Sequence, residues 1–125
     1  QQVEWATFLK DLHAYRLQMF AVAWIADYPD PQNFLDLLFH SRSVNNETRY
    51  SNPEVDRLLE VARTERDEKT RFGLYQQAEQ IIVTETPWIP LWHPGEGNVL
   101  IKPEVKDYLL LPLIVPRYRF VYLEK

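Results

Sequence analysis

Residues 15–31 read YRLQMFAVAWIADYPDP, and this stretch decides the fold that we expect. Apolar side chains occupy both alternating positions from Tyr15 to Ile25, which is typical of a strand buried on both faces of an α/β sheet. A buried helix is the alternative, but the proline steps at Pro29 and Pro31 favour a short element. The stretch therefore predicts a central strand that ends just before Asp27.

Helix-start signals follow the strand at three places. Asp30 and Asn52 each precede a proline, which suits an N-cap and a first helical residue, and Asp67 suits the same capping role. The apolar stripes that these three helices should bury are Phe34, Leu35, Leu37 and Leu38; Val55, Leu58, Leu59 and Ala62; and Leu74, Tyr75, Ala78, Ile81 and Ile82. The last of these helices should end at Pro87, and the polar run His40–Tyr50 should form a surface loop.

Further elements are expected towards both ends of the chain. Residues 1–12 suit the end of a strand followed by an amphipathic helix. Residues 88–92 and 98–102 suit two strands joined by the turn His93–Gly97, and residues 118–123 suit a last strand. The predicted architecture is a single α/β domain over residues 1–125.

Composition narrows the function classes. The 125 residues carry a net charge of -4, which argues against binding to nucleic acid or to an anionic membrane surface. The absence of cysteine excludes disulfides, thiolate zinc sites and thiol nucleophiles. The three histidines are far apart in the sequence and lack an H-E-x-x-H spacing, so we expect no metal site and no cofactor. No apolar run approaches the roughly 20 residues that cross a bilayer.

Asp27 is the candidate binding residue. It falls just past the carboxyl end of the predicted strand, where open α/β sheets bind ligands. Trp24 and Tyr28 flank it, with Ala26 between, and a carboxylate framed by aromatic rings suits a ligand with a cationic head and an apolar body. The alternatives are that Asp27 only forms a turn and that Trp24 belongs to the core.

Several segments resemble one known family, in order and in register. Trp24–Leu35 is similar to the signature stretch of the oligopeptide- and dipeptide-binding proteins, the family 5 extracellular solute-binding proteins. Tyr50–Leu59 resembles the Y-S-N-P-E-x-D-x-L-L helix start of that family, and Arg71–Ile82 resembles its R-x-x-L-Y-x-x-A-E-x-I helix. Glu4–Leu9, Pro87–Leu91 and Val105–Lys106 also match. The sequence departs from the family at 11–15, where many members have a Gly-Asp turn, and at Asp107, where glycine is common.

The resemblance implies a fold and a set of roles. The fold is the carboxy-terminal lobe of a two-lobed periplasmic-binding-protein type II clamp, with the last strand, about 117–125, returning to the other lobe. Asp27 would pair with the free α-amine of a peptide, and Trp24 would line the cavity together with Ala26 and Tyr28. Residues Gln1–Trp5 lack the basic and apolar regions of a secretory signal, so we expect a piece of a larger protein.

The resemblance also implies partners and a location. The protein would capture a peptide by lobe closure and deliver it to the membrane permease of an ABC importer, without catalysis, as a full-length monomer. It would act in the periplasm or outside the cell, with or without a lipid anchor. Two other hypotheses stay open: an oligosaccharide stacked on Trp24, Tyr28 and Trp88, and a hydrolase that uses Asp27 and Asp30 as acid and base.

Overall fold

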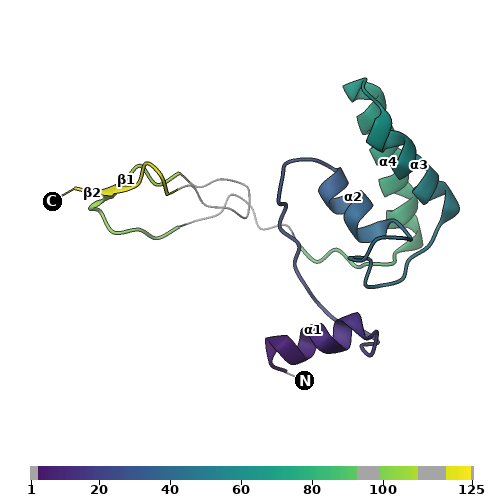
Figure 1. The fold of residues 1–125 in the computed structure, drawn as a ribbon, viewed down its shortest axis with the longest axis horizontal. Helices are drawn as coiled ribbons and strands as arrows, with labels where there is room; N and C mark the ends of the chain where they lie inside the picture. The colour runs from purple at the N-terminus through teal and green to yellow at the C-terminus, as the bar shows by residue number, and fades with distance from the viewer. Residues whose placement is uncertain (1–2, 93–98, 110–117, 125) are drawn as a thin grey trace.

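The computed structural model describes residues 3–92, 99–109 and 118–124. Within these residues the chain forms four helices and one pair of short strands (Figure 1). The elements are α1 (Trp5–His13), α2 (Gln32–Phe39), α3 (Pro53–Thr64), α4 (Glu68–Glu85), β1 (Val105–Lys106) and β2 (Tyr122–Leu123). Helices α2, α3 and α4 pack against one another, whereas α1 and the β1–β2 pair lie apart from them.

The three packed helices share one hydrophobic core. All four residues of the stripe predicted on α3 are buried, and Val55, Leu59 and Ala62 have no exposed surface at all (0%). Helix α4 contributes Tyr75, Ala78 and Ile82, while Leu74 and Ile81 pack against the core from its edge. These stripes were predicted from the 3.6-residue period, which places such positions on one face of a helix.

Helix α2 buries part of the predicted stripe, since Leu38 is buried and Leu35 packs against the core. Phe34 is 40% exposed, whereas Phe39 is buried beside Leu38. Asn33 and Asp36 are also buried, and each has polar partners: Asp36 accepts two hydrogen bonds of 2.6 Å from Arg63 of α3. The prediction was therefore only partly correct, because hydrophobicity alone does not anticipate buried polar side chains that are satisfied by distant partners.

The capping predictions at Asn52 and Asp67 are confirmed. The side chain of Asn52 accepts hydrogen bonds from the backbone N–H groups of Glu54 (2.9 Å) and Val55 (3.3 Å), and Asp67 accepts one from Thr70 (2.8 Å). The prediction for α2 was wrong by one residue: the helix begins at Gln32 and its N-cap is Pro31, although Asp30 still accepts a hydrogen bond from the N–H of Gln32 (2.9 Å). Helix α4 ends at Glu85, two residues before Pro87, as the fixed geometry of proline requires.

The segment His40–Tyr50 is a loop, but it is not merely a surface loop. Asn46 is 3% exposed, and its amide holds the two ends of the loop together. The Nδ2 group donates to the carbonyl oxygens of His40 (3.3 Å) and Tyr50 (2.7 Å), and Oδ1 accepts from the N–H of Tyr50 (3.1 Å). This internal bonding explains how a polar, aperiodic segment keeps a defined course between α2 and α3.

The predicted central strand is not formed within the described residues. Residues 16–26 follow an irregular course, and Met19 (87%), Val22 (46%) and Ile25 (57%) are exposed. A strand exists only when a neighbouring strand satisfies its backbone, and burial on both faces needs a layer on each side. Within the described residues, this segment has no neighbouring strand to pair with and no layer packed on each of its faces. The apolar pattern is therefore present without the partners that would bury it.

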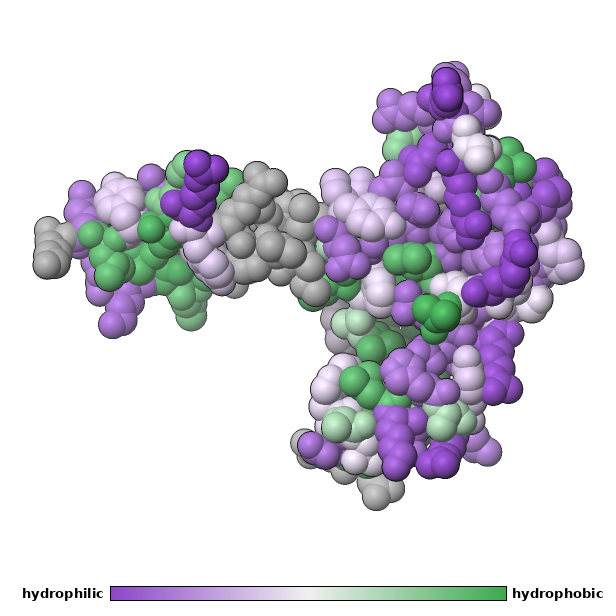
Figure 2. All heavy atoms as spheres, viewed as in Figure 1, coloured by the Kyte–Doolittle hydropathy of each residue, from purple (hydrophilic) through white to green (hydrophobic). Residues whose placement is uncertain are grey.

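The strands predicted near the carboxyl end are mostly absent too. Residues 88–92 and 99–102 form no strand, and the turn His93–Gly97 lies outside the described residues. The last predicted strand shrinks to Tyr122–Leu123, which pairs antiparallel with Val105–Lys106. Figure 2 shows patches of apolar surface around the β1–β2 pair, and Leu100 and Leu123 are among the exposed residues of this part of the chain. Polar surface dominates over α3 and α4.

Two departures from the family pattern coincide with left-handed backbone. Tyr15 has φ 54° and Asp107 has φ 57°, a region in which glycine has no steric penalty. The turns thus keep the geometry that suits glycine even though other residues stand there. At Tyr15 the aromatic ring is held by Arg49, whose guanidinium carbon lies 3.6 Å from the ring centroid.

Candidate ligand-binding site

The four residues predicted to bind ligand lie on one loop, Trp24–Tyr28, which leads into α2. The loop is fastened to α2 by Asn33, which has no exposed surface (0%). Its Oδ1 accepts a hydrogen bond from the indole N–H of Trp24 (2.9 Å) and another from the backbone N–H of Asp27 (3.2 Å). One buried oxygen therefore fixes both a side chain and the main chain of the loop.

A second fastening joins the end of the loop to α4. Arg71 donates two hydrogen bonds to the carboxylate of Asp30, at 2.6 and 2.9 Å, and its guanidinium carbon lies 4.9 Å from the ring centroid of Tyr75. These hydrogen bonds hold the pKa of Asp30 below its usual value, against the opposing effect of burial. Asp30 therefore bonds the first N–H of α2 and anchors the loop to α4. It is not available as a general acid.

The Asp30–Arg71 pair should make the stability of this region fall in acid. The pKa of Asp30 is lowered on folding. The contribution of this carboxylate to the free energy of unfolding is therefore complete at pH values above its ordinary pKa of 3.8, and it is lost as the pH falls through the pKa of the folded state. We expect the free energy of urea unfolding of the native full-length protein to fall more steeply between about pH 5 and pH 2 than that of Asp30→Asn. The asparagine keeps an acceptor for Gln32 but carries no charge. Parallel curves for the two proteins would contradict this prediction.

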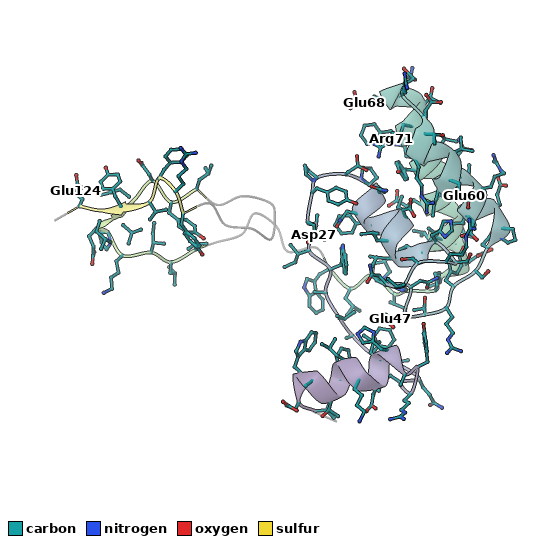
Figure 3. All side chains as sticks on the ribbon, viewed as in Figure 1. Asp27, Glu47, Glu60, Glu68, Arg71 and Glu124 are labelled. Carbon is teal, nitrogen blue, oxygen red and sulfur yellow. The ribbon has the colours of Figure 1, made fainter. Side chains whose placement is uncertain are left out.

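Asp27 itself is presented outwards. Its side chain is exposed, and within the described residues its carboxylate has no hydrogen-bond or ion-pair partner. Figure 3 shows Asp27 on the loop beside α2, on the side away from Arg71 and Glu60. Unlike the Asp30 carboxylate, which accepts two hydrogen bonds from Arg71, the Asp27 carboxylate has both oxygen atoms without a partner among the described residues.

The aromatic residues and Ala26 near Asp27 differ in how far they are buried and in what they contact. Trp24 is half-buried and packs against the core, so the core alternative is correct for part of its ring. Tyr28 is 38% exposed, and its hydroxyl donates to Oε1 of Gln32 (3.1 Å). Ala26 is half-buried. Trp88 packs its ring on Phe39, with centroids 4.9 Å apart, which leaves it engaged in the core.

The sequence reasoning missed two residues of this site. Asn33 and Arg71 both lie within the segments that carry the family resemblance, but neither stands out by charge pattern or periodicity. Their roles depend on contacts with residues 9 and 41 positions away. Among the described residues, no group of three or more histidine, aspartate or glutamate side chains is placed to hold a metal ion. No helix in the described part of the chain is long and apolar enough to span a bilayer.

Comparison with known proteins shows that the chain is similar to peptide-binding proteins. The chain is 40% identical over 111 residues to the dipeptide-binding protein DppE of Bacillus subtilis, covering 89% of this chain and 20% of DppE. It is 34% identical over 108 residues to the periplasmic murein peptide-binding protein MppA of Escherichia coli, covering 86% of this chain and 20% of MppA. No family model matches the chain.

The fold has solved counterparts as well. The periplasmic binding protein DppA of Helicobacter pylori, which is associated with an ABC transporter and was solved with the peptide STSA, matches with a TM-score of 0.84 and 30% identity. That match covers 100% of this chain and 25% of DppA, and it confirms the predicted fold class. The chain spans about a fifth of the length of the curated relatives it matches. It belongs to the family of dipeptide- and oligopeptide-binding proteins that its sequence resembles.

Proposed function

We propose that this chain forms one wall of the ligand cleft in a protein that captures dipeptides or oligopeptides for an ABC importer. The observation that carries the proposal is the Asp27 carboxylate, which is exposed and unpartnered within the described residues on a loop fastened by Asn33 and by the Asp30–Arg71 pair. Asp27 would neutralise the free α-amine of the peptide. Trp24, Ala26 and Tyr28 would shape the cavity beside it.

Electrostatics favours this assignment. A peptide amine that is enclosed in a cleft needs a charge partner, and leaving one member of such a pair unpaired costs roughly 2–5 kcal/mol. The attraction grows when closure of a second lobe removes water from around the pair. Main-chain hydrogen bonds and bridging waters would hold the rest of the peptide, which lets many sequences fit.

The partners and the location follow from the same proposal. The loaded protein would hand its peptide to a membrane permease and would itself act as a monomer that binds without transforming its ligand. It would lie in the periplasm or outside the cell, with or without a lipid anchor. The description of MppA as periplasmic supports the proposed location, and the description of DppA as associated with an ABC transporter supports the proposed permease partner.

The two other hypotheses are less well supported. A hydrolase would need Asp27 and Asp30 as a working pair, but Asp30 is occupied by Arg71. An oligosaccharide would need Trp24, Tyr28 and Trp88 as a stacking surface, but Trp88 packs against Phe39. A neutral sugar would also leave Asp27 without a charge partner.

A titration with paired ligands tests the proposal. The native full-length protein should bind a free peptide more tightly than its N-acetylated form by about 2–5 kcal/mol, or roughly 30- to 5,000-fold, because acetylation removes the positive charge. Isothermal titration calorimetry measures both affinities. Equal affinities would rule out the role of Asp27. Mass spectrometry of the peptide after long incubation should recover it intact, and cleaved peptide would reveal a hydrolase.

A further inference from the structure

Asn33 combines complete burial with an unusual division of its hydrogen bonds. It stands in the first turn of α2 and is 0% exposed. Its Oδ1 accepts two hydrogen bonds, both from the loop that carries Asp27. Its Nδ2 group is buried and has no hydrogen-bond partner among the described residues. All the bonds that this side chain makes in the described structure therefore serve the loop.

The two bonds constrain different parts of the loop. The bond from Trp24 sets the rotation of the indole ring, which is wedged against the core. The bond from Asp27 holds the backbone nitrogen next to the Cα from which the carboxylate extends. Because the bond uses the main chain of Asp27, its carboxylate is left free for another partner.

A contribution to stability does not by itself explain why asparagine stands at position 33. A buried donor without a partner costs about 1–3 kcal/mol, and the Nδ2 group of Asn33 is such a donor. Buried polar groups that are left partly unsatisfied in a native structure call for another explanation, and functional sites are where proteins tolerate such local conflicts.

We infer that Asn33 is a positioning residue of the peptide site, which aims the Asp27 carboxylate and the Trp24 ring at the ligand. The inference rests on the proposed function, since it takes Asp27 as the partner of the peptide amine. Asn33 does not touch the ligand. It fixes the distance between the aromatic wall and the charge, and thereby the fit of the first residue of the peptide.

The matched control is Asn46, a second buried asparagine (3% exposed) whose amide also holds a loop next to α2 and α3. Asn33→Ala and Asn46→Ala should both lower stability in the native full-length protein, because each breaks buried hydrogen bonds. Only Asn33→Ala should weaken binding of a free-amine peptide, by about tenfold or more, by analogy with the loss of outer-shell groups that orient metal ligands. It should also reduce the preference for the free peptide over its N-acetylated form.

A ligand-free measurement accompanies the titration. Hydrogen exchange of the Trp24 indole N–H and of the Asp27 backbone N–H, followed by NMR, should become faster in Asn33→Ala and stay unchanged in Asn46→Ala. Asn33→Asp keeps an oxygen acceptor in the same place, so it should protect both groups and retain most of the preference for the free peptide. If Asn33→Ala does not fold, loss of this protection or of this preference in Asn33→Asp would overturn the inference, because the accepting oxygen is still present.

The outcomes separate this inference from the proposed function. If the wild-type protein binds the free and the N-acetylated peptide with equal affinity, the proposed function fails and the inference fails with it. If the wild-type protein prefers the free peptide and Asn33→Ala keeps that preference in full, only the inference is overturned. Equal losses of affinity in Asn33→Ala and Asn46→Ala would also overturn it, because they would show a purely structural role.

Discussion

Replacing Asp27 by asparagine should weaken binding of a free-amine peptide by about 2–5 kcal/mol, or roughly 30- to 5,000-fold. Asparagine has nearly the same shape, and the backbone N–H that donates to Asn33 is unchanged. The substitution therefore removes the charge and little else. The enclosed ammonium would lose its charge partner while still being removed from water, which is the most expensive arrangement for a charged group. Isothermal titration calorimetry of the native full-length protein and of Asp27→Asn measures the difference.

Two controls make this result specific to the amine. N-acetylated peptide should bind Asp27→Asn about as well as it binds the wild-type protein, since the lost interaction is absent in both complexes. Asp107→Asn removes one negative charge from an exposed position in left-handed backbone, which asparagine tolerates, and should leave both affinities unchanged. An equal loss for both peptides would mean that Asp27 shapes the loop without pairing with the amine.

Replacing Leu59 by alanine should lower the free energy of unfolding by about 2–5 kcal/mol. Leu59 is 0% exposed and belongs to the core cluster on α3, the helix that packs against both α2 and α4. Its removal takes away buried apolar surface and leaves a cavity that the rest of the core cluster fills only in part. Urea unfolding followed by circular dichroism measures the loss.

Val61 provides the matched control on the same helix. It is 41% exposed, so Val61→Ala removes little buried surface and should change the free energy of unfolding by less than about 1 kcal/mol. If both substitutions had the same small effect, the packing of α3 between α2 and α4 would not carry the stability of this region. Neither substitution touches the loop at Asp27, so the ratio of affinities for free and acetylated peptide should not change.

The sequence by itself determined the elements whose signals are local. The caps at Asn52 and Asp67 and the buried stripe of α3 were predicted correctly, because capping and helical periodicity act over only a few residues. It also singled out Asp27 and its aromatic neighbours as one segment. That they form a ligand site is still a prediction.

Only the tertiary structure decided which polar residues work for the fold and which stay free. Asp27 and Asp30 look alike in the sequence, yet Asp30 is bonded to Arg71, 41 positions away, and Asp27 has no partner among the described residues. Asn33 became visible only through its contacts with Trp24 and Asp27. The apolar pattern of residues 16–26 likewise predicted a strand that no described neighbour completes. These hydrogen bonds and strand pairings join residues that are distant in the chain. A local sequence pattern therefore indicates which residues can form such bonds, but only the three-dimensional arrangement determines their partners.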